Sequence, residues 1–311
     1  MGGQEGFLIL PYTYGKCMER KTLFYIVAGV FIVSLFGVLA ALANIDLDTE
    51  SLGTATAQRI PISGTITTTG QQSLFSNALG SQAIADKIDA ANEDPNVEAV
   101  VLEINSPGGA PVASHEIVRA VDRVDKPVVA QIREAGASGA YWIASAADYV
   151  VADPVSITGS VGVVGSYLEF SGLLDDYNVS YQRFVAGEYK DLGSPFKNVS
   201  EDEEALFQEK IDLLGEYFLE DVVENRGLTP EQEARVATAQ IFVGVESVEA
   251  GLVDELGGRQ VTKQYLERTM NRSVQVKDTQ FQRGLFSSLG QTQTWLQPVQ
   301  AVRSGVTPLL T

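Results

Sequence analysis

The sequence predicts an α/β protein with a sheet rich in parallel strands, preceded by one transmembrane helix. Between residues 59 and 275, short β-branched apolar segments alternate with segments of helical periodicity, which is typical of strand–helix–strand units. Residues 23–43 contain no charged side chain, and about 20 apolar residues are enough to span a bilayer as a helix. A chain of 311 residues with 45% hydrophobic content can also bury one sizeable core.

The charges that flank the apolar segment predict its orientation. Basic residues precede it and acidic residues follow it: Lys16, Arg20 and Lys21, then Asp46, Asp48 and Glu50. The positive-inside rule places residues 1–22 in the cytoplasm and everything after the span at 23–43 outside the cell membrane. The alternative is a cleaved signal peptide, but its apolar region usually has only about 7–15 residues. The length therefore favours a single-pass anchor, followed by a polar linker at 44–58.

The region that follows, residues 59–275, is expected to form regular elements in a fixed order. Ser200 and Glu203 have the spacing of a capping box, and Asp94-Pro95 ends the first helix. Residues 276–311 are rich in Gln, Ser and Thr, and we interpret them as a tail that could be flexible. The expected strands are 59–68, 97–104, 127–132, 149–152, 161–164 and 180–185, and the expected helices are 81–92, 112–124, 138–147, 200–225, 229–237, 245–250 and 258–270.

Composition narrows the classes of function. The chain has one cysteine, Cys17, and one histidine, His115, so an intrachain disulfide is impossible and we expect no zinc or iron–sulfur site. Composition leaves a metal site made only of carboxylates open. The formal net charge of −18 disfavours nucleic acid as a partner, because phosphate binding needs basic patches. We interpret this large negative charge as an adaptation to high salt, in preference to an ordinary acidic protein, because salt screens the repulsion between the protein's own negative charges.

The candidate nucleophile is Ser138, in the small-residue segment Gly136-Ala137-Ser138-Gly139-Ala140 at the start of a predicted helix. Backbone N–H groups at such a turn can face a developing oxyanion. A serine needs a base, and with a single imidazole in the chain a neutral, buried lysine is the other option. The simpler interpretation is that a small residue allows tight helix packing at this position. His115 itself is expected to be a surface or partly buried helix residue.

Lys190 is the candidate base, in Gly187-Glu188-Tyr189-Lys190-Asp191. An ordinary lysine is protonated at neutral pH. The role of base therefore requires burial, with the carboxylates of Glu188 and Asp191 directed elsewhere. Taken alone, Lys190 is more simply a solvated lysine on an acidic surface, and only its place in the pattern below favours the base.

Four ordered segments carry a resemblance to a known family: INSPGG at 104–109, ASGAYWIA at 137–144, TGSVGV at 158–163 and GEYKDLGSP at 187–195. With this order and spacing the chain resembles the signal peptide peptidase A family over residues 59–266. The resemblance implies a ClpP/crotonase-like fold of repeated β-β-α layers and a membrane-anchored serine endopeptidase with a Ser-Lys dyad. The chain is similar in length to the members with a single catalytic unit.

The resemblance also implies roles for individual residues. Ser138 would be the nucleophile and Lys190 the general base, with Ser160 orienting the lysine. The backbone amides of Gly109 and Gly139 would form the oxyanion hole. The implied substrates are remnant signal peptides or exported proteins, and the family's rings or domes imply a homo-oligomer. No metal or cofactor is implied.

Some features leave alternatives open. Ala140 and Trp142 replace the glycine and tyrosine common in relatives, which leaves side-chain preference open. Rival functions are a related membrane protease that cuts one specific membrane partner, a crotonase-like acyl-CoA enzyme, and an inactive peptide-binding scaffold. Proteases that cut one specific membrane partner have a shorter serine-to-lysine separation in sequence, which argues against that function here. An acyl-CoA enzyme is disfavoured because the domain is predicted to lie outside the membrane, away from cytoplasmic CoA. Weak glycosylation motifs begin at Asn178, Asn198 and Asn271.

Overall fold

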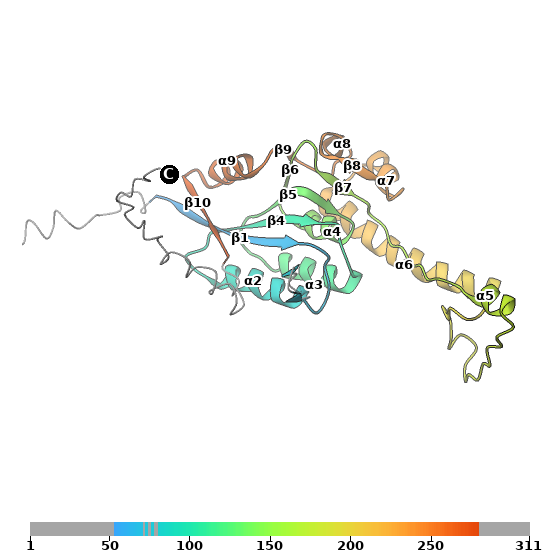
Figure 1. The fold of residues 1–311 in the computed structure, drawn as a ribbon. Coiled ribbons are helices and arrows are strands. Elements are labelled where there is room, and N and C mark those ends of the chain that lie inside the picture. Colours follow the sequence, from blue (N-terminus) through green and yellow to red (C-terminus); the bar gives the residue numbers. More distant parts are fainter. Residues whose placement is uncertain (1–52, 71, 74–75, 78–79, 280–311) are drawn as a thin grey trace, which may run out of the picture. The chain divides into compact units, whose positions relative to one another are not determined.

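The computed structural model describes residues 53–70, 72–73, 76–77 and 80–279 (Figure 1). The predicted cytoplasmic segment 1–22, the predicted span 23–43, most of the predicted linker and residues 280–311 of the predicted tail lie outside this part of the chain. Within it, no helix has the length and apolar character needed to cross a membrane.

The centre of the fold is a mostly parallel sheet, which confirms the predicted α/β class. Its strand order is β10-β1-β4-β5-β6-β9, with β7 beside β5 and β8 beside β7. The pairings are parallel except for that of β7 with β8. The strands are β1 (Ala55–Ser63), β4 (Ala99–Ser106), β5 (Val128–Ala137), β6 (Tyr149–Ala152), β7 (Ile157–Gly159), β8 (Ile241–Val243), β9 (Glu255–Leu256) and β10 (Val274–Asp278), and a separate hairpin pairs β2 (Gln72–Ser73) with β3 (Ser76–Asn77).

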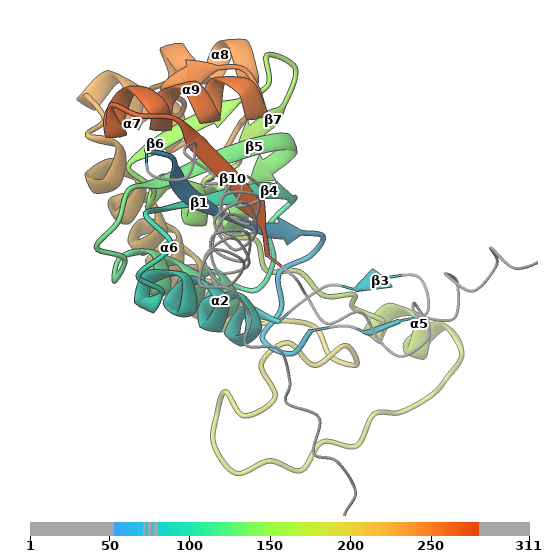
Figure 2. The same ribbon diagram turned by 90° about the vertical axis from the view of Figure 1, so that its left-hand side faces the viewer.

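Helices cover both faces of the sheet (Figures 1 and 2). On one face, Leu102 and Ile104 of β4 join the core with Ile117 of α3, whereas Val101 points to the other face and packs with Leu266 of α9. This alternation follows from the two-residue period of a strand, and burial on both faces explains the continuous apolar run of β4. The helices are α2 (Ser81–Glu93), α3 (Pro111–Val121), α4 (Gly139–Ser145), α5 (Ser171–Asp176), α6 (Glu201–Arg226), α7 (Pro230–Val236), α8 (Gly244–Glu249) and α9 (Arg259–Met270).

Helix α6 connects the sheet to a segment that lies away from it. Its 26 residues begin with the predicted capping box of Ser200 and Glu203 and end at Gly227, which has a left-handed φ of 58°. Near its end, Phe218 and Val222 are buried against the core. At 1.5 Å per residue the helix is roughly 39 Å long. Figure 1 shows α5 near the first turns of α6, away from the sheet.

Two predicted strands are wrong. Residues 161–164 and 180–185 are irregular, and the strand predicted at 161–164 lies earlier, at Ile157–Gly159, because only there does the chain pair with β5. Ser160, with a φ of 52°, ends that strand. Residues 180–185 include apolar side chains, but no strand in the described part of the chain pairs with them.

The folded part also extends beyond the predicted limits at 59 and 275. β1 begins at Ala55, and β10 continues to Asp278. The two extensions pair with each other in parallel, from Ala55 opposite Val274 to Arg59 opposite Asp278. The sequence of β1 does not indicate that β10 will be its partner strand, and the sequence of β10 does not indicate β1. Likewise Gly136, predicted in a turn, is the paired end of β5.

One buried carboxylate joins four elements of the fold. Glu103 of β4 is 8% exposed and accepts two hydrogen bonds from Arg259 of α9, at 2.8 and 3.0 Å. Arg59 of β1 and Arg133 of β5 lie 3.6 and 3.5 Å from it. Burial by itself would raise the pKa of Glu103, but the three arginines outweigh it and hold this pKa below its usual range.

We expect Glu103→Gln to lower the free energy of unfolding by about 1–3 kcal/mol at pH 7, since three arginines lose their shared charge and two of them are half-exposed. The pKa of Glu103 is lower in the folded than in the unfolded chain. The stabilisation by ionised Glu103 is therefore complete above the pKa of the unfolded chain, about 4.3. It is lost as the pH falls through the lower pKa of the folded chain. Urea denaturation across this range measures the difference.

The matched control is Glu209→Gln, which removes an exposed pair with Lys210 and should change stability by less than about 0.5 kcal/mol. A Glu103→Gln deficit equally large at pH 3 and pH 7 would contradict the assignment of this stabilisation to the charge.

Candidate active site

Ser138 lies where β5 ends and α4 begins. Its backbone is at φ 52° and ψ −132°, a conformation that is uncommon for a residue with a side chain and that is often found at functional positions. The N–H of Ser138 donates to the carbonyl of Gly159 at 2.8 Å, and its own carbonyl accepts from Tyr141 and Trp142. The pairing of Ala137 with Gly159 extends β5 up to the serine. The strand and the helix thus fix the serine from both sides.

The loop after β4 lies directly against Ser138, because neighbouring parallel strands end at the same edge of a sheet. Gly108 has a φ of +100°, and a Cβ there would lie 2.9 Å from the Cβ of Ser138 and from the N of Gly139. The hydroxyl of Ser106 accepts from the N–H of Gly108 at 3.1 Å and donates to the carbonyl of Gly64 at 2.6 Å. At position 108 only glycine fits against Ser138.

Two backbone amides lie side by side next to the serine. A Cβ placed on Gly139 would be 3.5 Å from the N of Gly109, so the two residues predicted as oxyanion donors are neighbours. Within the described part of the chain, neither amide has a hydrogen-bond acceptor. Unpaired N–H groups beside a serine hydroxyl form the arrangement that stabilises an oxyanion in acyl transfer.

A pocket of about 110 Å³ opens beside Ser138. Trp142 and Phe218 form its apolar wall, with their rings stacked at 4.6 Å. The indole N–H of Trp142 donates to Asp221 of α6 at 2.9 Å, which holds the ring in place. Such a pocket suits an uncharged side chain. Its lining residues are Gly109, Pro111, Ser138, Gly139, Trp142, Gly162, Val163, Val164 and Phe218.

Ser160 lies at the edge of this region. It follows β7 directly, is half-buried, and donates its N–H to the carbonyl of Gln240 at 2.9 Å. The preceding Gly159 bonds Ser138, and Gly162 and Val163 just beyond line the pocket. The structure therefore brings Ser138, Ser160, Gly109 and Gly139 to one place.

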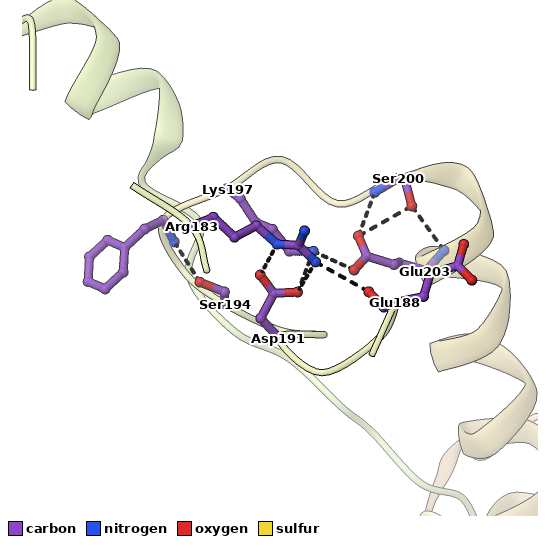
Figure 3. Close-up of polar contacts among 8 residues, drawn as sticks. Arg183, Glu188, Asp191, Ser194, Lys197, Ser200 and Glu203 are labelled. Carbon is purple, nitrogen blue, oxygen red and sulfur yellow. Dashed lines mark hydrogen bonds and ion pairs between the residues drawn. The ribbon is translucent and has the colours of Figure 1, made fainter. Parts of the chain in front are cut away.

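Lys190 is not at this place within one chain. It is exposed, in a series of turns where its N–H donates to the carbonyl of Gly187 at 3.3 Å. Its neighbour Asp191 is tied through Lys197 to Glu203 in the first turn of α6 (Figure 3). From Glu203 to Phe218, beside Ser138, is roughly 22 Å along the helix axis. The burial that the role of base requires is thus not provided by the same chain.

His115 lies behind the pocket and not in it. Its ring stacks on Trp142 at 5.3 Å, and its Nε2 is 3.2 Å from the hydroxyl of Tyr217. The residue is half-buried, as predicted for a helix residue without a role as base. Among the residues that the structure describes, no group of three or more His, Cys, Asp or Glu is arranged to hold a metal.

The sequence did not reveal two parts of the site. Phe218 lies in the predicted helix 200–225, and its local pattern cannot distinguish a pocket wall from a core residue. Ser114 of α3 is fully buried, its hydroxyl has no partner among the described residues, and a Cβ on Gly139 would lie 2.2 Å from it. This contact explains why a glycine follows Ser138, and no pattern in the sequence signals it.

The comparison with known proteins agrees with this geometry. Residues 120–274 match the model of peptidase family S49. The chain belongs to this family. The S49 match covers the site from α4 through Ser160 to the Lys190 turn, whereas the loop with Gly108 and Gly109 precedes it.

Three relatives illustrate the similarity. A provisionally named protease of Methanocaldococcus jannaschii is 35% identical over 188 residues, which is 60% of each chain. A provisionally named signal peptide peptidase SppA of Enterococcus faecium is 32% identical over 64% of this chain and 59% of its own length. Protease 4 of Haemophilus influenzae is 33% identical over 62% of this chain and 32% of its own length. The chain thus spans about 60% of the first two relatives and about a third of the other.

We expect Gly108→Ala to lower the free energy of unfolding by about 1–3 kcal/mol, because the new Cβ combines a positive φ with contacts at 2.9 Å. Gly215→Ala is the control, since a Cβ there meets no atom within 4 Å inside a helix and should stabilise by about 0.5–1 kcal/mol. Thermal or urea unfolding of both variants measures the effects. A Gly108→Ala protein as stable as the parent would show that the loop does not approach Ser138 so closely.

Proposed function

We propose that this protein is a membrane-anchored serine endopeptidase with Ser138 as nucleophile and Lys190 as general base. The observation that carries the proposal is the constrained Ser138 beside two unpaired amides and an apolar pocket. Membership of peptidase family S49 supports it. We also infer a ClpP/crotonase-like form of the α/β fold and a catalytic domain held outside the cell by residues 23–43.

The chemistry follows from the groups at the site. The Nζ of Lys190 accepts the proton of the Ser138 hydroxyl, and the oxygen attacks the peptide carbonyl carbon. The amides of Gly109 and Gly139 donate to the resulting oxyanion. Collapse of this intermediate breaks the C–N bond, and the lysine ammonium gives its proton to the leaving nitrogen. Water, deprotonated by the same lysine, then hydrolyses the acyl-enzyme, and the Ser160 hydroxyl orients the amine throughout.

We further propose that the lysine comes from a second copy of the chain. In one chain the turn with Lys190 is about 20 Å or more from Ser138 along α6, and the amine is exposed. The segment around it also exposes large apolar side chains, including Leu168 at 72%, Tyr177 at 76% and Phe184 at 92%. Contiguous exposed apolar surface marks an interaction site. A homo-oligomer would cover this surface and bury Lys190 in a neighbour's pocket, where desolvation favours a neutral amine.

The pocket suggests the substrate class. Its aromatic and valine lining accepts a small or medium apolar side chain and offers no charged group to bind a charged one. Remnant signal peptides, which are apolar and lie in the membrane, match both the pocket and the proposed anchor. One of the relatives described above is itself named a signal peptide peptidase. Misfolded exported proteins with exposed apolar segments are the second class that the pocket fits.

We expect Ser138→Ala and Lys190→Ala each to lower hydrolysis of a fluorogenic apolar peptide by at least about 100-fold, because one removes the nucleophile and the other its base. Lys210→Ala is the matched control, since it removes an exposed lysine of α6 whose one ion pair among the described residues is with Glu209. Equal rates for the parent and both site variants would refute the dyad.

Mixing the two inactive variants tests the second copy. If the dyad forms between chains, Ser138→Ala and Lys190→Ala proteins that are dissociated and reassembled together at equal amounts should regain about a quarter of the parental activity, as random pairing in a head-to-tail ring requires. Assembly of each variant alone is the control. No activity in a mixture shown to contain both chains would refute the contribution of a second copy.

A further inference from the structure

The turn that carries Lys190 is held by a network of four charged side chains (Figure 3). Arg183 binds the Asp191 carboxylate with two hydrogen bonds, from Nε to Oδ2 at 2.5 Å and from Nη2 to Oδ1 at 2.8 Å. Lys197 lies 3.1 Å from the same carboxylate and pairs with Glu203 of α6. Arg183 and Asp191 precede and follow the lysine in sequence, so the network connects both ends of its turn.

Arg183 also holds the backbone of this turn. Its Nη2 donates to the carbonyl of Glu188 at 3.3 Å, while the same group binds the carboxylate of Asp191. One guanidinium thus binds the chain on both sides of Lys190. A planar fork with several donors can do this, whereas a lysine ammonium is a single point charge.

The carboxylates of the network are mostly shielded from water, and the formal charges of the four side chains cancel. The side chains of Asp191 and Glu203 are 13% and 7% exposed, and those of Lys197 and Arg183 are 18% and 39% exposed. Both oxygens of Glu203 are used, since Lys197 binds one and the capping Ser200 binds the other. Two cations therefore balance two buried carboxylates. The network lines a surface cavity that is separate from the pocket at Ser138. The other charged groups that line this cavity are Glu188 and Asp202.

Asp191 would otherwise be a hazard for a lysine that acts as a base. The hydrogen bonds from Arg183, assisted by Lys197 and opposed by desolvation, hold the pKa of Asp191 well below its usual range, so this carboxylate is charged at every working pH. A free carboxylate next to an amine stabilises the protonated ammonium. In the part of the chain that the structure describes, Lys190 forms no ion pair, and Arg183 and Lys197 occupy its acidic neighbour instead.

We propose that Arg183 is a positioning residue for the catalytic lysine. By binding the Glu188 carbonyl and the Asp191 carboxylate together, it fixes the turn that presents Lys190 and keeps the adjacent carboxylate away from the amine. This inference rests on the proposed role of Lys190 as the general base.

The test is the pH dependence of kcat/KM for the apolar peptide, measured on the full chain. In Arg183→Met, Asp191 loses both hydrogen bonds from Arg183 and keeps only Lys197, so its carboxylate can turn toward Lys190 and favour the ammonium. The acidic limb of the profile should therefore move up by about one pH unit, with about a tenfold loss at neutral pH and a smaller loss on the alkaline plateau. Arg183→Lys, which keeps the charge but cannot bridge both groups, should give an intermediate shift.

The double variant Arg183→Met/Asp191→Asn separates electrostatics from simple support of the fold. With the carboxylate removed, the acidic limb should return toward its parental position, although one more group of the network is lost. If the network only supports the loop, the double variant will be no better than Arg183→Met, and both will lose activity equally at every pH. That result would overturn the proposal.

The matched control is Arg235→Met in α7. Arg235 has a side-chain exposure of 37%, close to the 39% of Arg183, and pairs with Glu249 away from this turn. Its loss should leave the pH profile unchanged, and a shift equal to that of Arg183→Met would contradict a local effect. If Lys190→Ala remains active, the base and the positioning role both fail. If Lys190→Ala is inactive and Arg183→Met keeps the parental profile, only the positioning role fails.

Discussion

The close approach of the loop after β4 to the first residues of α4 is the constraint on which the rest of the site depends. Parallel strands β4 and β5 end at the same edge of the sheet, and their loops must share the space beyond it. That space is so small that a Cβ on Gly108 or Gly139 would collide with its neighbours. The absence of these two Cβ atoms places the unpaired amides beside the hydroxyl of Ser138 without any dedicated side chain.

Helix α6 has the opposite effect, since it separates Ser138 from Lys190, the two residues of the proposed dyad. Its end is fixed to the core by Phe218, Val222 and the bond from Trp142 to Asp221. Its beginning holds the Lys190 turn through Glu203 and Lys197. A continuous helix is stiff, so the lysine cannot reach the serine of its own chain by a small rearrangement of side chains. This separation is the reason for proposing that a second copy of the chain supplies the lysine.

Arginine binds a shielded carboxylate in the same way near the sheet and in the turn that contains Lys190. In a chain with a formal net charge of −18, the well-shielded carboxylates Glu103 and Asp191 each bind an arginine through two hydrogen bonds. Planar guanidinium groups bind carboxylates in this way and remain charged at all relevant pH values. Near the sheet the pairing joins strands to α9, and in the Lys190 turn it directs an acidic side chain away from the proposed base. One kind of contact thus serves stability in one place and electrostatic control in the other.

The sequence by itself determined the α/β class, most helices and the identity of Ser138 and its glycine neighbours. These depend on local periodicity, on capping pairs such as Ser200 and Glu203, and on short motifs read within a few residues. Tertiary structure alone decided that β1 pairs with β10, that residues 161–164 and 180–185 are not strands, and that Phe218 forms a pocket wall with Trp142. It also decided that Lys190 lies exposed and far from Ser138 in its own chain. The physical reason is that pairing partners and distances across a fold depend on contacts between residues remote in sequence, which no local pattern contains.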